Sequence, residues 1–298
     1  MKPEALVSII VNCYNGEKYL RKAIDSILSQ TYKNFEIIFW DNQSTDGSAA
    51  LFNSYKDLRF RYFKAPIHTL LYEARNYAIE KASGEFIAFL DVDDKWLPNK
   101  LEKQMLCFAD PEVGLVCGNF WIKHERKHKM WIALSKQVAT GWVLNNLLES
   151  NFVGLLTLVV RKSAFDMLSY PCDKRYHIIG DFDLVIRLSI NWKLEFVKEP
   201  IALYRIHGNN ESSKHRDRHI NEWTCWLNEM ESNEAIRTCE SWYMVVNNFI
   251  YLQAIDMSLQ GRKKEVFKLL CRLPFGIQKL RLLLAILLPT IIINHIKN

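Results

Sequence analysis

The first ninety residues alternate between short β-branched segments and longer segments whose apolar residues recur at helical spacing, and this alternation restricts the fold most strongly. Residues 7–11 form the first β-branched run, which is followed by a polar turn and then by Leu20, Ala23, Ile24, Ile27 and Leu28. Apolar residues three and four positions apart predict an amphipathic helix, whereas a short apolar run predicts a buried strand. Repeated strand and helix units predict an α/β fold with a parallel sheet and helices on both faces.

Two regions are expected along the chain. The other predicted elements are strands at 35–40, 59–63, 86–90 and 152–160, helices at 71–81 and 182–190, and two strands within 113–134. The basic tip at residues 123–129 is interpreted as a solvated hairpin end, with an anion-binding patch as the alternative. Long helical segments follow residue 214, and no Gly or Pro occurs between Lys214 and Gln260. The sequence therefore predicts an α/β domain at 1–213 and a helical region at 214–298.

Composition excludes several classes of protein. A hydrophobic content of 49% over 298 residues is too high for a disordered chain. The seven cysteines are odd in number and never fall at CxxC spacing, which disfavours a disulfide framework or a zinc site and favours a reducing, cytoplasmic location. The apolar run before Asn12 is shorter than a signal peptide core and is interpreted as a strand. No motif or strong charge cluster in the α/β domain predicts a nucleic-acid partner.

Polar side chains follow three of the predicted strands. Asn12 and Tyr14 follow the first, Asp41 and Asn42 the second, and the acidic stretch 91–94 the fourth. Ligands of such sheets bind at the carboxyl ends of the strands. No GxG and no GxxxxGK occurs, so a dinucleotide-binding dehydrogenase and a P-loop enzyme both lose support.

The acidic stretch "LDVDDKW" places three carboxylates at the end of a buried strand. Carboxylates that lie so close together raise one another's pKa unless a cation or hydrogen-bond donors stabilise them. Mg²⁺ and Mn²⁺ take oxygen ligands and commonly bridge to substrate phosphates. A metal and diphosphate site is therefore predicted. Capping of the next helix by Asp93 or Asp94 is the alternative, and it accounts for one aspartate only.

Four motifs occur in an order that identifies the chain as similar to family 2 glycosyltransferases of the GT-A fold. They are "VSIIVNCYNGEKYLRKAIDSILSQTYKNFEIIFWDNQSTDGS", "EARNYAIEKASGEFIAFLDVDDKWLP", "IGDFDLVIRLS" and "YRIHGNNES". The resemblance covers about residues 5–213. It implies transfer of a sugar from a nucleotide-diphosphate donor to an acceptor hydroxyl, with inversion at the anomeric carbon.

The resemblance also implies which residues bind the nucleotide. Asn12 and Tyr14 match the loop that touches base and ribose, and Asp41 and Asn42 match the acidic pair that reads the base. Many relatives have a second aspartate at position 42, so the asparagine leaves open whether the base is uracil, thymine or guanine. Arg75 in "EARN" matches a nucleotide contact, and an exposed helix arginine is the alternative interpretation.

The metal ligands and the base follow from the same resemblance. Residues 91–94 match the DxD element, in which Asp91 and Asp93 contact the nucleotide, and Asp93 and Asp94 with His207 ligate Mn²⁺ or Mg²⁺. Asp181 matches the general base, although Gly180 replaces an acidic residue that many relatives carry. Asp183 lies four residues before Arg187, which predicts a surface ion pair and a structural role.

The C-terminal tail mixes basic residues with an apolar run at 282–293, which is too short to cross a bilayer. One interpretation is an interfacial segment at the inner face of the cell membrane, where Lys263, Lys264, Lys268, Arg272, Lys279 and Arg281 meet anionic head groups. The other is a helix that packs on the α/β domain or on the second subunit of a homodimer. The first predicts a lipid-linked saccharide as the acceptor, in cell-surface polysaccharide synthesis. An inactive nucleotide-sugar-binding or scaffold protein is the alternative function.

Overall fold

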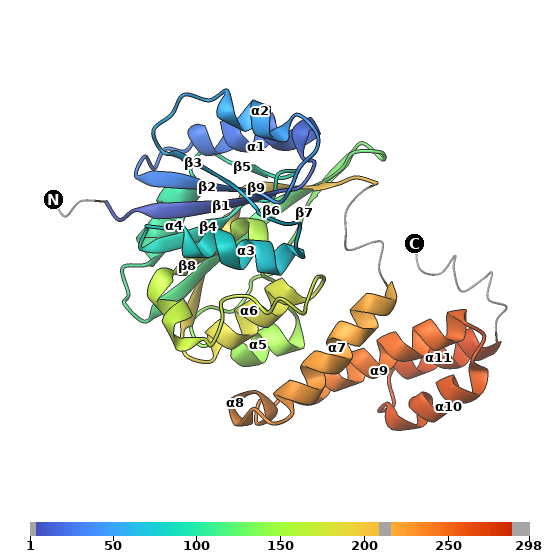
Figure 1. The fold of residues 1–298 in the computed structure, drawn as a ribbon. Helices are drawn as coiled ribbons and strands as arrows, with labels where there is room; N and C mark the ends of the chain where they lie inside the picture. Colours follow the sequence, from blue (N-terminus) through green and yellow to red (C-terminus); the bar gives the residue numbers. More distant parts are fainter. Residues whose placement is uncertain (1–3, 209–215, 288–298) are drawn as a thin grey trace. The chain divides into compact units, whose positions relative to one another are not determined.

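A computed structural model describes residues 4–208 and 216–287, and these divide into two compact units. Residues 4–147 and 151–208 belong to the first unit, and residues 148–150 and 216–287 belong to the second. The first unit alternates strands and helices in its first half, as the sequence predicts (Figure 1). These elements are β1 (Val7–Cys13), α1 (Glu17–Leu28), β2 (Phe35–Asp41), α2 (Ser48–Asn53), β3 (Phe60–Lys64), α3 (Leu71–Glu80), β4 (Phe86–Phe89), β5 (Lys95–Trp96) and α4 (Lys100–Cys107).

The second half of the first unit adds the rest of the sheet, with both parallel and antiparallel pairs. Its elements are β6 (Val113–His124), β7 (Lys129–Ile132), α5 (Leu144–Glu149), the 3₁₀ helices Leu155–Thr157 and Lys162–Met167, β8 (Val159–Arg161), α6 (Gly180–Ser189) and β9 (Lys193–Ile206). The described strands form one sheet in the order β3-β2-β1-β4-β8-β6-β9-β5, with β7 paired to β6. Strands β3, β2, β1 and β4 run parallel to one another, and β8 runs antiparallel to β4. The prediction of a mostly parallel α/β sheet is confirmed.

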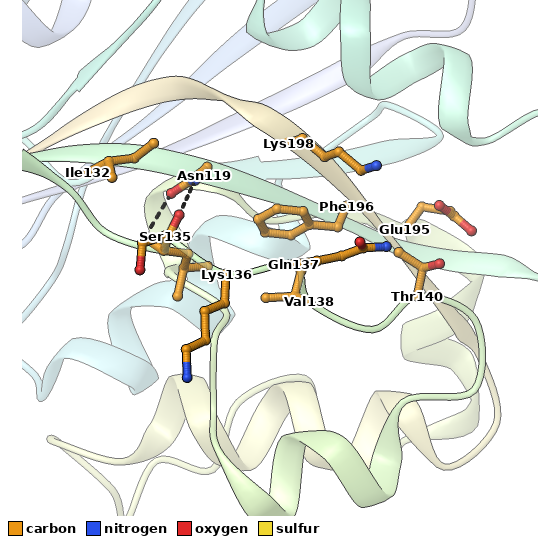
Figure 2. A pocket seen from close by; sticks show the side chains of 11 residues that line it. Asn119, Ile132, Ser135, Lys136, Gln137, Val138, Thr140, Glu195, Phe196 and Lys198 are labelled. Carbon is orange, nitrogen blue, oxygen red and sulfur yellow. Dashed lines mark hydrogen bonds between the residues drawn. The ribbon is translucent and has the colours of Figure 1, made fainter.

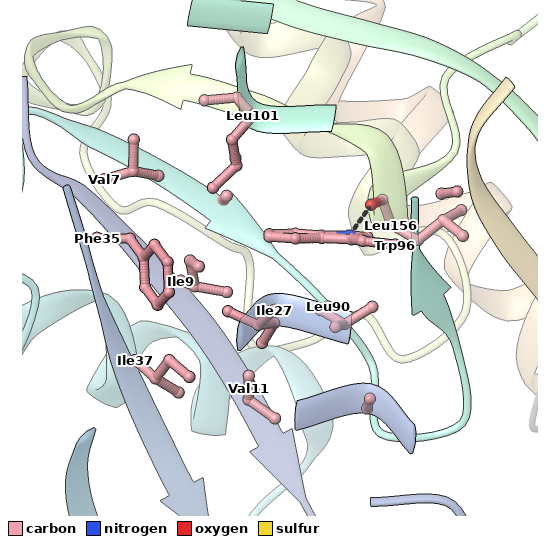
Figure 3. Close-up of a cluster of buried hydrophobic side chains, with 14 of the residues drawn as sticks. Val7, Ile9, Val11, Ile27, Phe35, Ile37, Leu90, Trp96, Leu101 and Leu156 are labelled. Carbon is pink, nitrogen blue, oxygen red and sulfur yellow. Dashed lines mark hydrogen bonds between the residues drawn. The ribbon is translucent and has the colours of Figure 1, made fainter. Parts of the chain in front are cut away.

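Helices cover both faces of the sheet, with α1 and α2 on one side and α3 on the other (Figure 1). The core between α1 and the sheet contains β-branched residues from β1 and β2 and the apolar face of α1. Figure 3 shows Trp96 in this core, where its indole N–H donates to the carbonyl oxygen of Leu156 at 2.7 Å. This bond satisfies a buried donor and links β5 to the 3₁₀ helix that precedes β8.

Within the first unit one prediction is wrong, and one strand is not predicted at all. Residues 152–160 were expected to form one strand, but the chain forms the 3₁₀ helix Leu155–Thr157 and only the short strand β8. The sequence also gave no prediction of β9, the longest strand described, which pairs in parallel with β6. The two strands predicted within 113–134 are confirmed as β6 and β7, and their antiparallel pairing makes the basic tip a hairpin turn.

The second unit is helical, and its helices are α7 (Arg216–Met230), α8 (Glu234–Arg237), α9 (Trp242–Leu259), α10 (Lys263–Arg272) and α11 (Ile277–Leu287). A small apolar cluster joins α9, α10 and α11, and Leu282 of α11 is fully buried in it. In the described residues no helix has the length and apolar character needed to span a membrane. The predicted apolar run at 282–293 continues past residue 287 and so lies partly outside the described residues.

Candidate active site

The parallel strands bring the predicted polar residues to one edge of the sheet. Cys13 of β1 pairs with Asp41 of β2, and Ile10 of β1 pairs with Phe89 of β4. The residues that follow β2 and β4 therefore reach the same edge as the end of β1. This edge is where a ligand of a doubly wound sheet binds.

Arg75 and Asp91 form an ion pair at this edge, in which the Arg75 side chain is buried and the Asp91 side chain is 39% exposed. The guanidinium of Arg75, which is only 2% exposed, donates from Nη2 to Asp91 Oδ1 at 2.7 Å. Burial alone lowers the pKa of Arg75, but the interactions with Asp91, Tyr72 and Cys172 together outweigh burial and the pKa is raised. The alternative of an exposed helix arginine is wrong. Nη1 of Arg75 has no hydrogen-bond partner within the described residues, so a buried cationic donor remains for a ligand oxygen.

Asp93 and His207 are brought together by β4 and β9. His207 Nε2 lies 2.9 Å from Asp93 Oδ2, and the imidazole ring stacks on Tyr19 with its centroid 5.1 Å away. Burial raises the pKa of Asp93 and the charge of Asp91 raises it further, while His207 opposes the shift. His207 is therefore a mostly buried partner of the acidic stretch, not a residue on a solvated turn.

Asp94 has a different environment from Asp93. Its Oδ1 accepts the backbone N–H of Arg205 at 3.0 Å, and the residue is 2% exposed. Burial raises the pKa of Asp94 well above its usual range, and the charges of Asp93 and Asp91 add to this effect. The carboxyl group of Asp94 therefore favours the protonated form far more than an exposed aspartate does.

The predicted metal ligands are thus assembled only in part. Of the three, the structure joins Asp93 and His207 directly, and it directs Asp94 toward the backbone of β9. Within the described part of the chain, no three His, Cys, Asp or Glu side chains are grouped as they would be to hold a metal ion. The capping alternative is wrong, because α4 begins after its N-cap Asn99 and receives no side-chain cap.

The two residues predicted to read the base are fixed by the protein itself. Asp41 accepts the backbone N–H of Ser44 at 2.8 Å and the hydroxyl of Tyr62 at 2.6 Å. The amide of Asn42 donates to the Thr69 carbonyl at 2.8 Å and accepts the Thr69 N–H at 3.2 Å. A carboxylate could accept the second bond but could not donate the first. This geometry gives a structural reason for asparagine at position 42.

An aromatic pair lies beside Asn42. The ring of Tyr14, which is 54% exposed, is centred 4.3 Å from the ring of His68, and His68 Nδ1 donates to the backbone carbonyl of Asn42 at 2.9 Å. The amide nitrogen of the nearby buried Asn12 has no partner among the described residues. Sequence reasoning found Tyr14 and Asn12 but missed His68, because no motif or spacing distinguishes this histidine after β3.

Asp181 lies in the first turn of α6 and is half-buried. Its backbone N–H donates to the hydroxyl of Tyr72 at 2.9 Å, and its Oδ1 accepts the N–H of Phe182 at 2.8 Å. Burial raises the pKa of Asp181, and the N–H of Phe182 and the charge of Arg75 offset the effect only partly. A carboxylate with a raised pKa is a stronger proton acceptor than an exposed aspartate.

Asp183 forms the predicted pair with Arg187, but the pair is buried and not on the surface. The carboxylate of Asp183 is 2% exposed and lies 2.7 Å from Arg187 Nη2. The same guanidinium donates to the backbone carbonyls of Tyr170 and Pro171. Asp183 is therefore committed to holding α6 against the segment that precedes it.

A separate pocket of about 660 Å³ lies between β9 and the segment that follows β7 (Figure 2). None of the predicted site residues lines it. Its wall includes Asn119 and Phe196, which lie well before the carboxyl ends of β6 and β9. The amide of Asn119 is already bonded to both the N–H and the carbonyl of Leu134, so its polar atoms are satisfied within the wall.

Comparison with known proteins identifies the family of this chain. The profile of Glycosyl transferase family 2 matches residues 8–168. The chain belongs to this family. Over 218 residues it is 38% identical to UDP-Glc:alpha-D-GlcNAc-diphosphoundecaprenol beta-1,3-glucosyltransferase WfaP of Escherichia coli, covering 70% of this chain and 80% of that one. It is also 34% identical to UDP-Glc:alpha-D-GlcNAc-diphosphoundecaprenol beta-1,3-glucosyltransferase WfgD of Escherichia coli, over 56% of this chain and 64% of that one.

Solved structures of low sequence identity share the fold of this family 2 glycosyltransferase. Staphylococcus aureus TarS, residues 1–349 in complex with UDP-GlcNAc, superposes with a TM-score of 0.64 at 15% identity, covering 85% of this chain and 82% of that one. The mannosyltransferase PcManGT of Pyrobaculum calidifontis, in complex with GDP-Man and Mn²⁺, gives a TM-score of 0.60 at 16% identity, covering 95% and 79%. The predicted GT-A fold is confirmed.

Proposed function

We propose that this glycosyltransferase moves a sugar from a nucleotide-diphosphate donor to an acceptor hydroxyl with inversion at the anomeric carbon. One observation carries the proposal. Asp181, the proposed base, is connected through Tyr72 and Arg75 to Asp91 in the acidic stretch, by contacts of 2.9, 4.7 and 2.7 Å. A group suited to accept a proton is thereby held beside groups suited to bind a nucleotide diphosphate.

Asp181 is the carboxylate in α6 that we assign as the base. Asp183 is excluded by its ion pair with Arg187, and position 180 has no side chain. In the reaction, Asp181 takes the proton of the acceptor hydroxyl while the hydroxyl oxygen bonds to the anomeric carbon. The bond from that carbon to the diphosphate oxygen breaks on the opposite face, and the nucleoside diphosphate leaves. Attack opposite the leaving group inverts the anomeric configuration.

We propose that the sugar nucleotide binds to hydrogen-bond donors at the sheet edge that have no protein partner among the described residues. Nη1 of Arg75 and the amide nitrogen of Asn12 can each donate a hydrogen bond to an oxygen of the sugar nucleotide. The exposed ring of Tyr14 offers a stacking face for the base. Asp41 and Asn42 hold the loops that surround the base, and Asp91 positions Arg75.

The side chains of Asp93 and His207 fit a divalent cation. Three neighbouring carboxylates, two of them with raised pKa values, concentrate negative charge that a cation relieves. One carboxylate oxygen and one imidazole nitrogen suit Mn²⁺ better than Mg²⁺, which prefers oxygen ligands alone. When bound, such an ion neutralises the charge that develops on the leaving diphosphate. Asp94 is proposed to support the site through β9 and, when ionised, to contribute to the cation site.

The substrate classes are proposed from the relatives. WfaP and WfgD carry names that specify a UDP-glucose donor and a diphosphoundecaprenol-linked acceptor. We extend this to a nucleotide-sugar donor and a lipid-linked saccharide acceptor, used in cell-surface polysaccharide synthesis. An acceptor of this kind places the enzyme at the cytoplasmic face of the membrane.

Helices α10 and α11 present a surface suited to that location. Exposed basic side chains there are Lys263, Lys264, Lys268, Arg272 and Arg281, and exposed apolar ones are Phe267, Phe275, Ile277, Leu280 and Leu283. Phe275 is 96% exposed. Basic residues interleaved with exposed aromatic and aliphatic ones fit the head-group region of an anionic membrane. We propose that this basic-apolar surface binds the membrane peripherally.

Donor hydrolysis tests the proposed reaction. The purified protein is incubated with UDP-, dTDP- and GDP-sugars and Mn²⁺ or Mg²⁺, and proton NMR follows the anomeric configuration of the sugar first released. We expect one nucleotide to be preferred and the released sugar to be inverted. Release with retained configuration, or no release and no binding of any of these donors, contradicts the proposal.

Vesicle partitioning tests the membrane surface separately. Replacing Lys264 and Lys268 by glutamate should abolish cosedimentation with vesicles that contain phosphatidylglycerol and leave donor hydrolysis unchanged. Replacing the exposed Lys22 and Lys56 of the first unit by glutamate is the matched control. Equal partitioning of the two double variants removes the membrane proposal without affecting the proposed reaction.

A further inference from the structure

Gly180 and Tyr72 fit together in a way that the family resemblance does not explain. A Cβ atom placed on Gly180 would lie 2.5 Å from Cε2 of the Tyr72 ring. The ring cannot easily move aside, because Tyr72 is only 3% exposed and lies in a packed interior. An acidic side chain at position 180 is therefore incompatible with tyrosine at position 72, and the two residues form a matched pair.

Tyr72 makes two further contacts, one toward each half of the proposed site. Its hydroxyl oxygen accepts the N–H of Asp181, which is one of the first-turn donors that a helix cannot satisfy internally. Its ring lies under the guanidinium of Arg75, with the carbon of that group 4.7 Å from the ring centroid. A single rigid side chain thus contacts both the first turn of α6 and the Arg75–Asp91 ion pair.

We infer that Tyr72 is a positioning residue that fixes the base Asp181 relative to the donor-binding Arg75, and that Gly180 makes room for it. This inference rests on the proposed function and deepens it. Tyr72 does not itself touch the reacting atoms. It acts through the backbone of Asp181, because the hydroxyl holds the first turn of α6 and the ring limits how closely α3 and α6 approach.

Tyr72→Phe is the appropriate variant, since it removes the hydroxyl and keeps the ring beneath Arg75. Displacement of a catalytic group by about 1 Å can lower the rate by about 10²-fold, so we expect kcat to fall by roughly 10- to 100-fold. The Kd for nucleoside diphosphate should stay within about twofold, because the stacking on Arg75 remains. Tyr55→Phe is the matched control, since it removes a tyrosine hydroxyl bond to the exposed Asp25, away from the proposed site.

A double-variant cycle separates positioning from a merely structural role. If Tyr72 acts through the base, Tyr72→Phe changes the residual single-turnover rate of Asp181→Asn by less than about twofold. A structural role lowers the rate by the same factor in both backgrounds, and that result overturns the inference. Gly180→Ala provides a second variant, because it displaces the same ring without removing the hydroxyl, and it should also lower kcat more than nucleotide affinity.

The outcomes also distinguish this inference from the proposed function. If Asp181→Asn retains the parent rate, the assignment of the base fails, whatever Tyr72→Phe does. If Asp181→Asn is inactive and Tyr72→Phe and Gly180→Ala both turn over like the parent, the base stands and the inference about Tyr72 is wrong.

Discussion

Replacing Asp183 by asparagine should destabilise the protein, and replacing Asp181 by asparagine should not. The two residues lie in the same helical turn but have different surroundings. Asp183 is the anionic partner of an Arg187 side chain that is itself only 12% exposed, whereas Asp181 forms no ion pair within the described residues and burial raises its pKa. The Asp183 variant leaves a buried positive charge without its counter-charge.

The magnitude follows from what Arg187 retains. Removing one partner of a buried ion pair costs about 3–5 kcal/mol. Arg187 keeps its bonds to two backbone carbonyls, and the new amide can still accept one hydrogen bond, so the loss should be about 2–3 kcal/mol. For a unit of this size each kcal/mol moves the melting temperature by about 2–4 °C. Asp183→Asn should therefore melt roughly 4–12 °C below the parent.

Asp181→Asn should behave in the opposite way at pH 7. A carboxylate whose folded pKa is raised stabilises the fold only below its unfolded pKa, and it opposes folding as the pH rises through the folded value. The amide removes that opposition, so the melting temperature should stay equal or rise while turnover falls by about 10²- to 10⁴-fold. Calorimetry and donor turnover per folded molecule measure both effects. A melting loss in Asp181→Asn as large as in Asp183→Asn would refute the reasoning.

Four other outcomes are expected. The acidic limb of the kcat/KM profile should lie above the usual pKa of an aspartate, about 3.9, and should disappear in Asp181→Asn; a limb near 3.9 contradicts the raised pKa. Asp93→Asn should weaken Mn²⁺-dependent nucleotide binding in calorimetry without lowering the melting temperature. Asp94→Asn should raise the melting temperature at pH 7, and the gain should vanish as the pH falls toward about 4, since only the ionised parent is penalised. Asn42→Asp loses the donor to Thr69 and should cost about 1–3 kcal/mol in chemical denaturation.

The spacing of apolar residues was sufficient to predict the parallel strands β1, β2 and β4, but not β9 or the segment 152–160. The strands β1, β2 and β4 are short apolar runs buried on both faces, so their composition alone distinguishes them. Strand β9 carries charged residues and Pro200 in its middle, and the register shifts where it pairs with β6, so it has no continuous apolar run. The error at 152–160 has another cause. An apolar run of that length fits a strand or a buried helical turn equally well. The hydrogen bond from Trp96 to the Leu156 carbonyl forms only in the folded protein, so it cannot be read from the sequence.

The candidate site was also predicted only in part. The motifs located the acidic residues, but they could not assign each one a partner, because those partners come from distant parts of the chain. His207 is 114 positions from Asp93, and Tyr72 is 109 positions from Asp181. Sequence spacing therefore predicted the local pair of Asp183 and Arg187 and missed that it is buried.

The three aspartates after β4 can share one edge because each is stabilised by a different kind of group. Asp91 faces a permanent cation, the guanidinium of Arg75. Asp94 accepts the backbone N–H of Arg205, and burial raises its pKa. Asp93 faces the imidazole of His207. Of the three, Asp93 therefore gains most from a bound divalent cation, and cation binding should depend more strongly on Asp93 than on Asp94.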